Sequence, residues 1–189
     1  MPPKVKFTKE QILDAAFTIA NKEGFDAITI RKVADMLGAS IAPIYVNFKN
    51  LDELKYALAD MIMEIIEDIV LSTKTHDAFL DIGAGNIKLA MEYTMLFRDF
   101  HFNPNCKKYF RTDESHQSKI IEKMSGSKKL EGLTHQEMAY ILQIMAHVTY
   151  GVIFDYLQGT YHKSYDEIIK YLEEAADNFI SGYKMKKGE

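Results

Sequence analysis

The sequence has few of the residues that cross-link a fold or interrupt regular backbone. Its single cysteine, Cys106, excludes an intramolecular disulfide and is typical of a reducing compartment. Only four prolines and ten glycines occur among 189 residues, so long segments contain no backbone breaker. No segment alternates apolar and polar residues for long enough to indicate a strand. These shortages predict an all-α protein.

Signals for secretion and membrane insertion are also missing. The N-terminal residues include no apolar segment of the signal-peptide kind, and no uninterrupted apolar run approaches the ~18 residues that a membrane span requires. We therefore expect a cytoplasmic protein with no membrane partner.

The motifs of common enzyme classes are absent as well. The sequence has no Gly-rich phosphate loop, no G-x-S-x-G and no H-x-x-x-H pair. His101, Cys106 and His116 are residue types that bind metals, but their spacing matches no closed metal site. We expect a protein that is not an enzyme and that has neither a cofactor nor a metal site.

Charge is distributed unevenly along the chain. The formal net charge is −4, yet residues 1–50 sum to +2 and the remaining residues to −6. A small DNA-facing head on an acidic body has this pattern, because phosphate contacts need local cations only. A chance imbalance on a solvated surface explains the same counts, so charge by itself leaves both interpretations open.

Capping signals and apolar periodicity divide the chain into helices. Thr8-x-x-Gln11, Thr134-x-x-Glu137 and Ser164-x-x-Glu167 are capping boxes, and Asn50-x-x-Glu53 resembles one. Apolar residues recur at helical spacing after each box, and glycine or proline follows several of the stretches. The predicted helices cover about residues 8–24, 29–38, 40–48, 50–72, 77–101, 134–158 and 164–183, with two short helices between 104 and 124.

The segment from Thr29 to Phe48 has the pattern of a helix-turn-helix. Two short helices that cross steeply need a small residue at the crossing and a glycine in the turn, which Ala34 and Gly38 provide. The residues that would fill its interior are Val33, Leu37, Ile44 and Phe48. Any tight helical hairpin has the same spacing, so this pattern alone does not establish DNA binding.

The run from Phe7 to about Leu58 resembles the DNA-binding domain of the TetR/AcrR family. The matching features are Gly24-Phe25, Thr29-x-x-x-x-Ala34, the turn at Gly38, Tyr45-x-x-Phe48, and Leu51, Leu54 and Leu58. The resemblance implies a three-helix DNA-binding domain at residues 1–50 and a ligand-binding and dimerisation domain at residues 51–189. It also implies a transcriptional regulator, by default a repressor, that binds double-stranded DNA as a homodimer and is released by a small, largely apolar ligand.

The same resemblance assigns DNA contacts to individual positions, with further phosphate contacts expected from Lys6 and Lys9. The expected DNA-binding residues are Thr29, Arg31, Ser40, Ile41, Ala42, Pro43, Tyr45, Asn47 and Lys49.

Two features of this sequence depart from the family pattern. The recognition helix lacks Arg, Lys and Gln, so Ile41 or Ala42 would have to meet thymine methyls, and Leu51 replaces a lysine common in the family. The alternative is a ligand-binding or coactivator protein whose head does not read DNA specifically.

Residues beyond position 60 include many Met and aromatic side chains, which adapt to apolar ligands but equally fill an ordinary core. The expected pocket residues are Met61, Met91, Met95, Phe97, His101, Phe110, Met145 and Tyr150.

The last two helices are apolar over more than one face, which indicates a four-helix dimer interface; a buried helix pair in a monomer is the alternative. The expected interface residues are Met145, Thr149, Val152, Leu172, Ala176 and Phe179.

Overall fold

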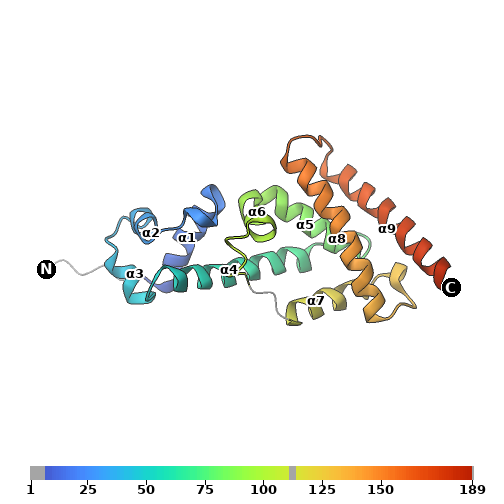
Figure 1. Ribbon diagram of the computed structural model, residues 1–189, viewed down its shortest axis with the longest axis horizontal. Coiled ribbons are helices and arrows are strands. Elements are labelled where there is room, and N and C mark those ends of the chain that lie inside the picture. The colour runs from blue at the N-terminus through green and yellow to red at the C-terminus, as the bar shows by residue number, and fades with distance from the viewer. Residues whose placement is uncertain (1–6, 111–113, 189) are drawn as a thin grey trace. The chain divides into compact units, whose positions relative to one another are not determined.

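A computed structural model describes residues 7–110 and 114–188, and these residues form helices and turns without a strand. Four helices precede residue 73, and the fourth is long (Figure 1). The α-helices are α1 (Lys9–Glu23), α2 (Ile30–Met36), α3 (Ala42–Asn47), α4 (Leu51–Ser72), α5 (Leu80–Glu92), α6 (Thr94–Phe102), α7 (Glu114–Met124), α8 (His135–Leu157) and α9 (Tyr165–Lys187). Short 3-10 helices η1 (Phe25–Ala27) and η2 (Lys128–Leu130) complete the list. The all-α prediction is confirmed.

The capping boxes begin helices where the sequence predicts them. In α1, α8 and α9 the cap hydroxyl accepts a hydrogen bond from the third helical N–H, and the side chain at that position accepts one from the cap N–H. Because the Thr134 N–H and then Lys187 stabilise the carboxylate, the pKa of Glu137 falls to about 2. The Asn50 side chain likewise accepts from the N–H of Glu53, at 2.9 Å. Hydrogen bonds between near neighbours therefore set these helix starts.

Three of the helix predictions differ from the structure, namely those for residues 77–101, for the first of the two short helices between 104 and 124, and for the end of the last helix. The expected helix at 77–101 is divided at Tyr93, whose φ of −127° and ψ of 51° are not helical. The reason is tertiary: α5 packs against α8 and α9, whereas α6 packs against α1 and η1. The residues from Asn103 to Tyr109 form turns, and the last helix continues past the predicted end near Tyr183 to Lys187.

The chain divides into two compact units. The first comprises residues 1–66 and 93–111, and the second comprises residues 67–92 and 112–189. The first part of α4 and all of α6 thus group with the N-terminal helices. The sequence-based division into residues 1–50 and 51–189 stays a prediction about domains, and each unit is described by itself below.

In the first unit, a cluster of aromatic side chains surrounds Phe25, which is fully buried. Its ring lies 5.4 Å from that of Tyr109 and 5.2 Å from that of Phe110, between ring centroids. The ammonium of Lys55, which is nearly buried, lies 5.3 Å from the centre of the Phe25 ring in a cation–π arrangement. The turn after α1 is therefore part of the core.

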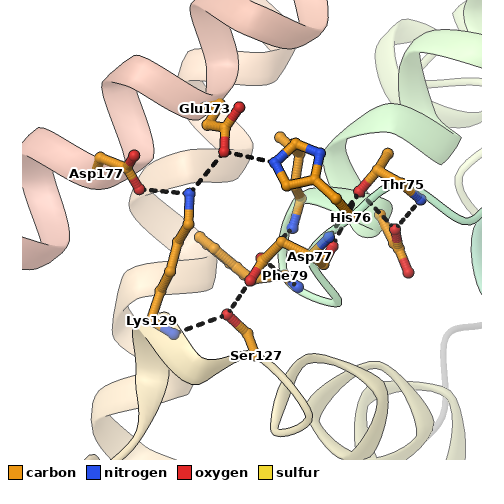
Figure 2. A network of polar contacts seen from close by, with 10 residues as sticks. Thr75, His76, Asp77, Phe79, Ser127, Lys129, Glu173 and Asp177 are labelled. Carbon is orange, nitrogen blue, oxygen red and sulfur yellow. Dashed lines mark hydrogen bonds and ion pairs between the residues drawn. The ribbon is translucent and has the colours of Figure 1, made fainter.

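In the second unit, a polar network joins the loop after α4 to η2 and α9. Lys129 lies between the carboxylates of Glu173 and Asp177, at 3.0 and 2.6 Å (Figure 2). Glu173 also bonds to His76, at 2.7 Å, and Ser127 donates to Asp77, at 2.6 Å. Apolar residues of α5, α7, α8 and α9 form the core of this unit.

Helix α8 has the length and hydropathy of a membrane span, although only 33% of its most apolar window is buried. One such helix is weak evidence for membrane insertion, because core helices of soluble proteins meet the same two criteria. The feature that needs an explanation is the apolar surface that α8 leaves open.

Candidate nucleic-acid interface

Local interactions build the helix-turn-helix formed by α2, the following turn and α3. The Thr29 hydroxyl caps α2 by accepting from the N–H of Lys32, at 3.1 Å. Gly38 adopts a φ of +62°, which glycine tolerates without strain, and turns the chain toward α3. Val33, Ala34 and Ile44 are buried between the helices. The predicted turn is therefore present, and of the four predicted interior residues Val33, Ile44 and Phe48 are buried while Leu37 is half-buried. Helix α3 begins at Ala42, and its N-cap residue, Ile41, makes no side-chain cap hydrogen bond.

Most of the predicted DNA-binding side chains lie on the outer surface of this unit. Seven of the nine are exposed: Thr29, Arg31, Ser40, Ile41, Ala42, Tyr45 and Lys49. Pro43 is half-buried in the first turn of α3, where its missing N–H costs no hydrogen bond. The structure leaves these residues accessible to a ligand as large as a DNA duplex.

Val46 belongs to this surface and was not among the predicted contacts. Its side chain is 85% exposed, against 51% for Tyr45 and 47% for Ile41. The sequence could have predicted the position of Val46 on this surface, because Val46 follows Ala42 by four residues and therefore lies on the same helix face.

Asn47 is a correction to the predicted phosphate contacts. Its side-chain amide donates to the carbonyl of Pro43, at 2.9 Å, and to the carbonyl of Phe7, at 3.2 Å. A phosphate oxygen accepts hydrogen bonds, and both N–H groups of this amide already serve backbone carbonyls. Asn47 instead ties the segment before α1 to α3.

Several cationic side chains belong to the helix-turn-helix and the segments next to it in sequence. Arg31 on α2 and Lys49 after α3 are exposed, and Lys32 forms an ion pair with Glu23, at 2.6 Å. The Lys9 ammonium lies 5.1 Å from the centre of the Phe48 ring. Lys6, which was expected to add a phosphate contact, lies outside the described residues. Exposed apolar and cationic side chains thus occur in the same helix-turn-helix and the turn after it, and a DNA-binding face needs cations to contact phosphates.

Helix α6 holds the turn between α1 and α2 in place. The Asp99 carboxylate, which is nearly buried, accepts from the N–H of Phe25 and from the side-chain amide of Asn103, the latter at 3.0 Å. The same amide donates to Asp26, at 3.0 Å, and this bond lowers the pKa of Asp26. Gly24 adopts a φ of +91° beside Asp99. Sequence reasoning missed this support, because 74 residues separate Asp99 from Phe25.

The predicted pocket residues fall into both units. Met61, Met95, Phe97, His101 and Phe110 belong to the first unit, whereas Met91, Met145 and Tyr150 belong to the second. In the first unit the His101 ring lies 4.3 Å from Phe97 and 4.5 Å from Phe100, and burial lowers the pKa of His101 to about 4. The ligand pocket itself stays a prediction.

Of the residues considered for a metal site, Cys106 lies in surroundings that oppose metal binding, as its burial and thiol pKa show. Cys106 is buried, and burial followed by the nearby Asp99 and Asp26 raises its thiol pKa to about 12, which opposes the thiolate that binds metals. The side chain of His116 lies outside the described residues.

Most of the residues predicted for the dimer interface on α8 and α9 are buried within the single chain. Five of the six expected residues are buried within this one chain, namely Met145, Thr149, Val152, Leu172 and Ala176. They pack inward, so they have little surface left for a partner. The sixth, Phe179, is half-buried.

An open groove of mixed polar and apolar lining occupies the neighbouring face of α8. It is lined by Gln136, Ala139, Tyr140, Leu142, Gln143 and Ala146. The Tyr140 ring lies 6.4 Å from Phe179 and 5.9 Å from Tyr183, so this surface continues onto α9. We define the groove residues with Phe179 and Tyr183 as the outer face.

Comparison with known proteins gives one consistent result. The domain model of the bacterial regulatory proteins of the tetR family matches residues 12–58. The class D tetracycline repressor protein of Escherichia coli is 26% identical over 159 residues, which are 82% of this chain and 69% of the repressor.

Solved structures show the same fold over almost the whole chain. A TetR variant from Acinetobacter baumannii AYE in complex with minocycline has a TM-score of 0.58 and 19% identity, covering 95% of this chain and 98% of its own. BioQ with its double-stranded DNA operator has a TM-score of 0.55 and 15% identity, covering 90% of this chain and 98% of its own. The helix-turn-helix followed by a helical domain is therefore a fold shared with these regulators.

Proposed function

The chain belongs to the TetR family of transcriptional regulators, which are DNA-binding proteins and not enzymes, and from that premise we propose a specific mode of action. The protein is a repressor that binds operator DNA as a homodimer. It leaves the operator when a small, largely apolar molecule binds its helical body.

The exposed surface of the helix-turn-helix is the observation that carries the DNA-binding part of the proposal. Ile41 is exposed at the N-cap of α3 and Tyr45 is exposed in the helix, while the cations Arg31, on α2, and Lys49, two residues after α3, are exposed in the same unit. A recognition helix that enters the major groove needs exposed side chains that reach base edges and cations that contact the phosphates at its flanks. The exposed residues of α2, α3 and the turn after α3 support this assignment.

The homodimer of the proposal would pair two chains through the outer face, which is open to solvent in the single chain. The groove on α8 presents the small side chains of Ala139 and Ala146 between Tyr140 and Leu142, so a second helix can approach closely. A two-fold axis through this face would cover apolar surface that one chain leaves open. Two recognition helices would then address half-sites about 34–36 Å apart or a multiple of that distance.

Release by a ligand rests on the composition of the body and on one relative. The structural neighbour from Acinetobacter baumannii is solved with minocycline, a small molecule. In this chain the predicted pocket residues are mainly Met and aromatic side chains, which suit an apolar ligand. Couplings between two ligands of one protein typically amount to about 1–3 kcal/mol, so we expect the effector to weaken operator binding by roughly 5- to 150-fold.

A mobility-shift titration with DNA from upstream of the protein's own coding region tests the proposal. The wild type is expected to bind this DNA more tightly than shuffled DNA of equal composition, with an affinity that falls steeply as salt rises. The double variant Arg31→Ala, Lys49→Ala should lose affinity for every sequence and lower the salt slope by about one for each phosphate contact removed.

Lys186→Ala is the matched control, because this exposed lysine lies on α9 and should change neither affinity nor salt slope. A wild-type dimer that binds no DNA above the shuffled background would contradict the proposal. The alternative, a ligand-binding protein that acts through a partner regulator, would then be favoured.

A further inference from the structure

We propose that α3 recognises the C5-methyl groups of pyrimidines, and that Val46 is the side chain that determines this specificity, with Ala42 one turn before it on the same face. The inference rests on the proposed DNA binding and deepens it. It assigns the operator half-site a chemical class, a thymine-rich sequence read by apolar contact.

The exposure of the aliphatic side chains on α3 and at its N-cap, Ile41, is the first observation. Val46 is 85% exposed and Ile41 is 47% exposed, although both are residue types that folding normally buries. Ala42 is exposed and lies one helical turn before Val46, so the two form a continuous strip. An apolar strip on the outer surface of a helix-turn-helix indicates a surface that is covered when the protein works.

The polar inventory of α3, which the structure describes in full, is the second observation. The bidentate pairs that identify guanine and adenine need Arg, Lys, Asn or Gln. The one such residue on α3 is Asn47, and its amide N–H groups are directed to the carbonyls of Pro43 and Phe7. Tyr45 retains one hydroxyl, and Ser40 retains another just before the helix.

The major groove presents one apolar feature that varies with sequence, the C5-methyl group of thymine. An isopropyl group such as that of Val46 has no polar atom to satisfy, so a methyl partner suits it and a bare polar base edge does not. The structure therefore favours thymine, or another 5-methylpyrimidine, opposite Val46.

Charge decides between DNA and an apolar protein partner as the occupant of this strip. Lys49 is exposed three residues after Val46, and Arg31 on α2 and Thr29 at its start are exposed in the same helix-turn-helix. Cations beside an apolar strip fit the two phosphate backbones that border a major groove. We therefore assign double-stranded DNA to this surface.

Substitution of deoxyuridine for thymidine is the direct test, because it removes the C5-methyl group and leaves every base-pairing group unchanged. Binding sites are first enriched from random duplexes with the wild-type protein, and affinity is then measured with uridine at each half-site position in turn. Burial of one methyl group predicts that uridine at the contacted position weakens wild-type binding by roughly threefold to tenfold.

Val46→Ala should bind the thymidine site more weakly and the uridine site almost as well as the wild type does, so that the ratio of the two affinities approaches one. Val46→Ile should keep the ratio. Met185→Ala is the control, because Met185 is 77% exposed but lies on α9, and it should leave the ratio unchanged. Circular dichroism of each variant shows whether it is folded.

Three results would overturn the inference. A wild type that binds thymidine and uridine sites equally has no methyl readout, while the proposed DNA binding stands. A ratio that survives in a folded Val46→Ala protein assigns the readout to a different side chain. If the wild type enriches no sequence and binds no DNA, the proposed function fails and the inference fails with it.

Discussion

In the first unit, the surroundings of buried side chains determine their hydrogen bonds and, for His101, the pKa. His101 lies against Phe97 and Phe100 and is held neutral, and Asp99 serves the backbone N–H of Phe25. Asn47 directs its amide to backbone carbonyls. These side chains hold the unit together, while Tyr45 and Val46 project into solvent and remain available for contacts.

Burial of His101 predicts a pH-dependent loss of stability. Burial lowers its pKa to about 4 from an ordinary 6.5, so the unfolded chain binds this proton more readily than the folded one. Stability should therefore fall as the pH is lowered from 6.5 toward 4, by about 3 kcal/mol from this residue.

Urea denaturation of the wild type and His101→Phe at several pH values measures this effect. The variant should lose less stability than the wild type between pH 6.5 and 4, and the two should run parallel above pH 7.5. Equal slopes for both proteins throughout would show that His101 titrates normally.

Tyr45 is expected to position the protein on DNA without reading sequence. Removal of its hydroxyl in Tyr45→Phe should weaken binding to all sequences by a similar factor, because a phosphate contact carries no base information. Fluorescence anisotropy with an enriched duplex and with shuffled DNA measures both affinities. Loss at one sequence with retention at the other would indicate that Tyr45 contacts a base.

At the scale of elements, close approach of helices determines which substitutions are tolerated. The end of α4 packs so closely on α5 that a Cβ at Gly85 would lie 2.7 Å from the Cα of Val70. A Cβ at Gly83, two residues earlier, would lie 3.5 Å from Leu172, which is ordinary contact. One helix thus contains a glycine at which a side chain would collide with α4, Gly85, and a glycine at which a methyl group fits, Gly83.

Gly85→Ala and Gly83→Ala form a matched pair that tests this packing. The backbone of α4 would have to move for Gly85→Ala, which should destabilise the protein by about 1–3 kcal/mol. Gly83→Ala should be neutral or stabilising by up to about 1 kcal/mol, because alanine favours the helix. Thermal and urea denaturation compare the two variants, and equal stabilities would show that α4 and α5 do not approach this closely.

At the scale of the whole molecule, the outer face of α8 and α9 determines the proposed assembly. Ala176 is only 4% exposed within one chain, so a charge there would unfold the second unit before it reported on a partner. Ala146 lies in the open groove, where one chain by itself accommodates a longer side chain. The groove is therefore the place to test dimerisation.

If the proposed homodimer forms through this groove, Ala146→Glu should give folded monomers. A second chain would bury the carboxylate without a partner charge, at a cost of several kcal/mol. Light scattering measures the mass of the wild type, of Ala146→Glu and of the control Lys88→Glu, whose lysine is exposed on α5. A folded Ala146→Glu protein that remains dimeric would place the interface elsewhere.

The sequence by itself determined the helical class, the helix starts at Thr8, Thr134 and Ser164, and the turn at Gly38. Each of these features depends on residues within about four positions of one another, through helix caps, apolar periodicity or a positive φ. Because such interactions are local, they can be predicted from the sequence alone.

Only the tertiary structure decided which faces those helices bury. The division at Tyr93 follows from the different partners of α5 and α6, and Asp99 reaches Phe25 across 74 residues. The inward packing of Leu172 and the outward position of Val46 likewise depend on neighbours distant in sequence. Burial is a property of the folded neighbourhood, so the pattern of one helix predicts that it has an apolar side but not which element covers it.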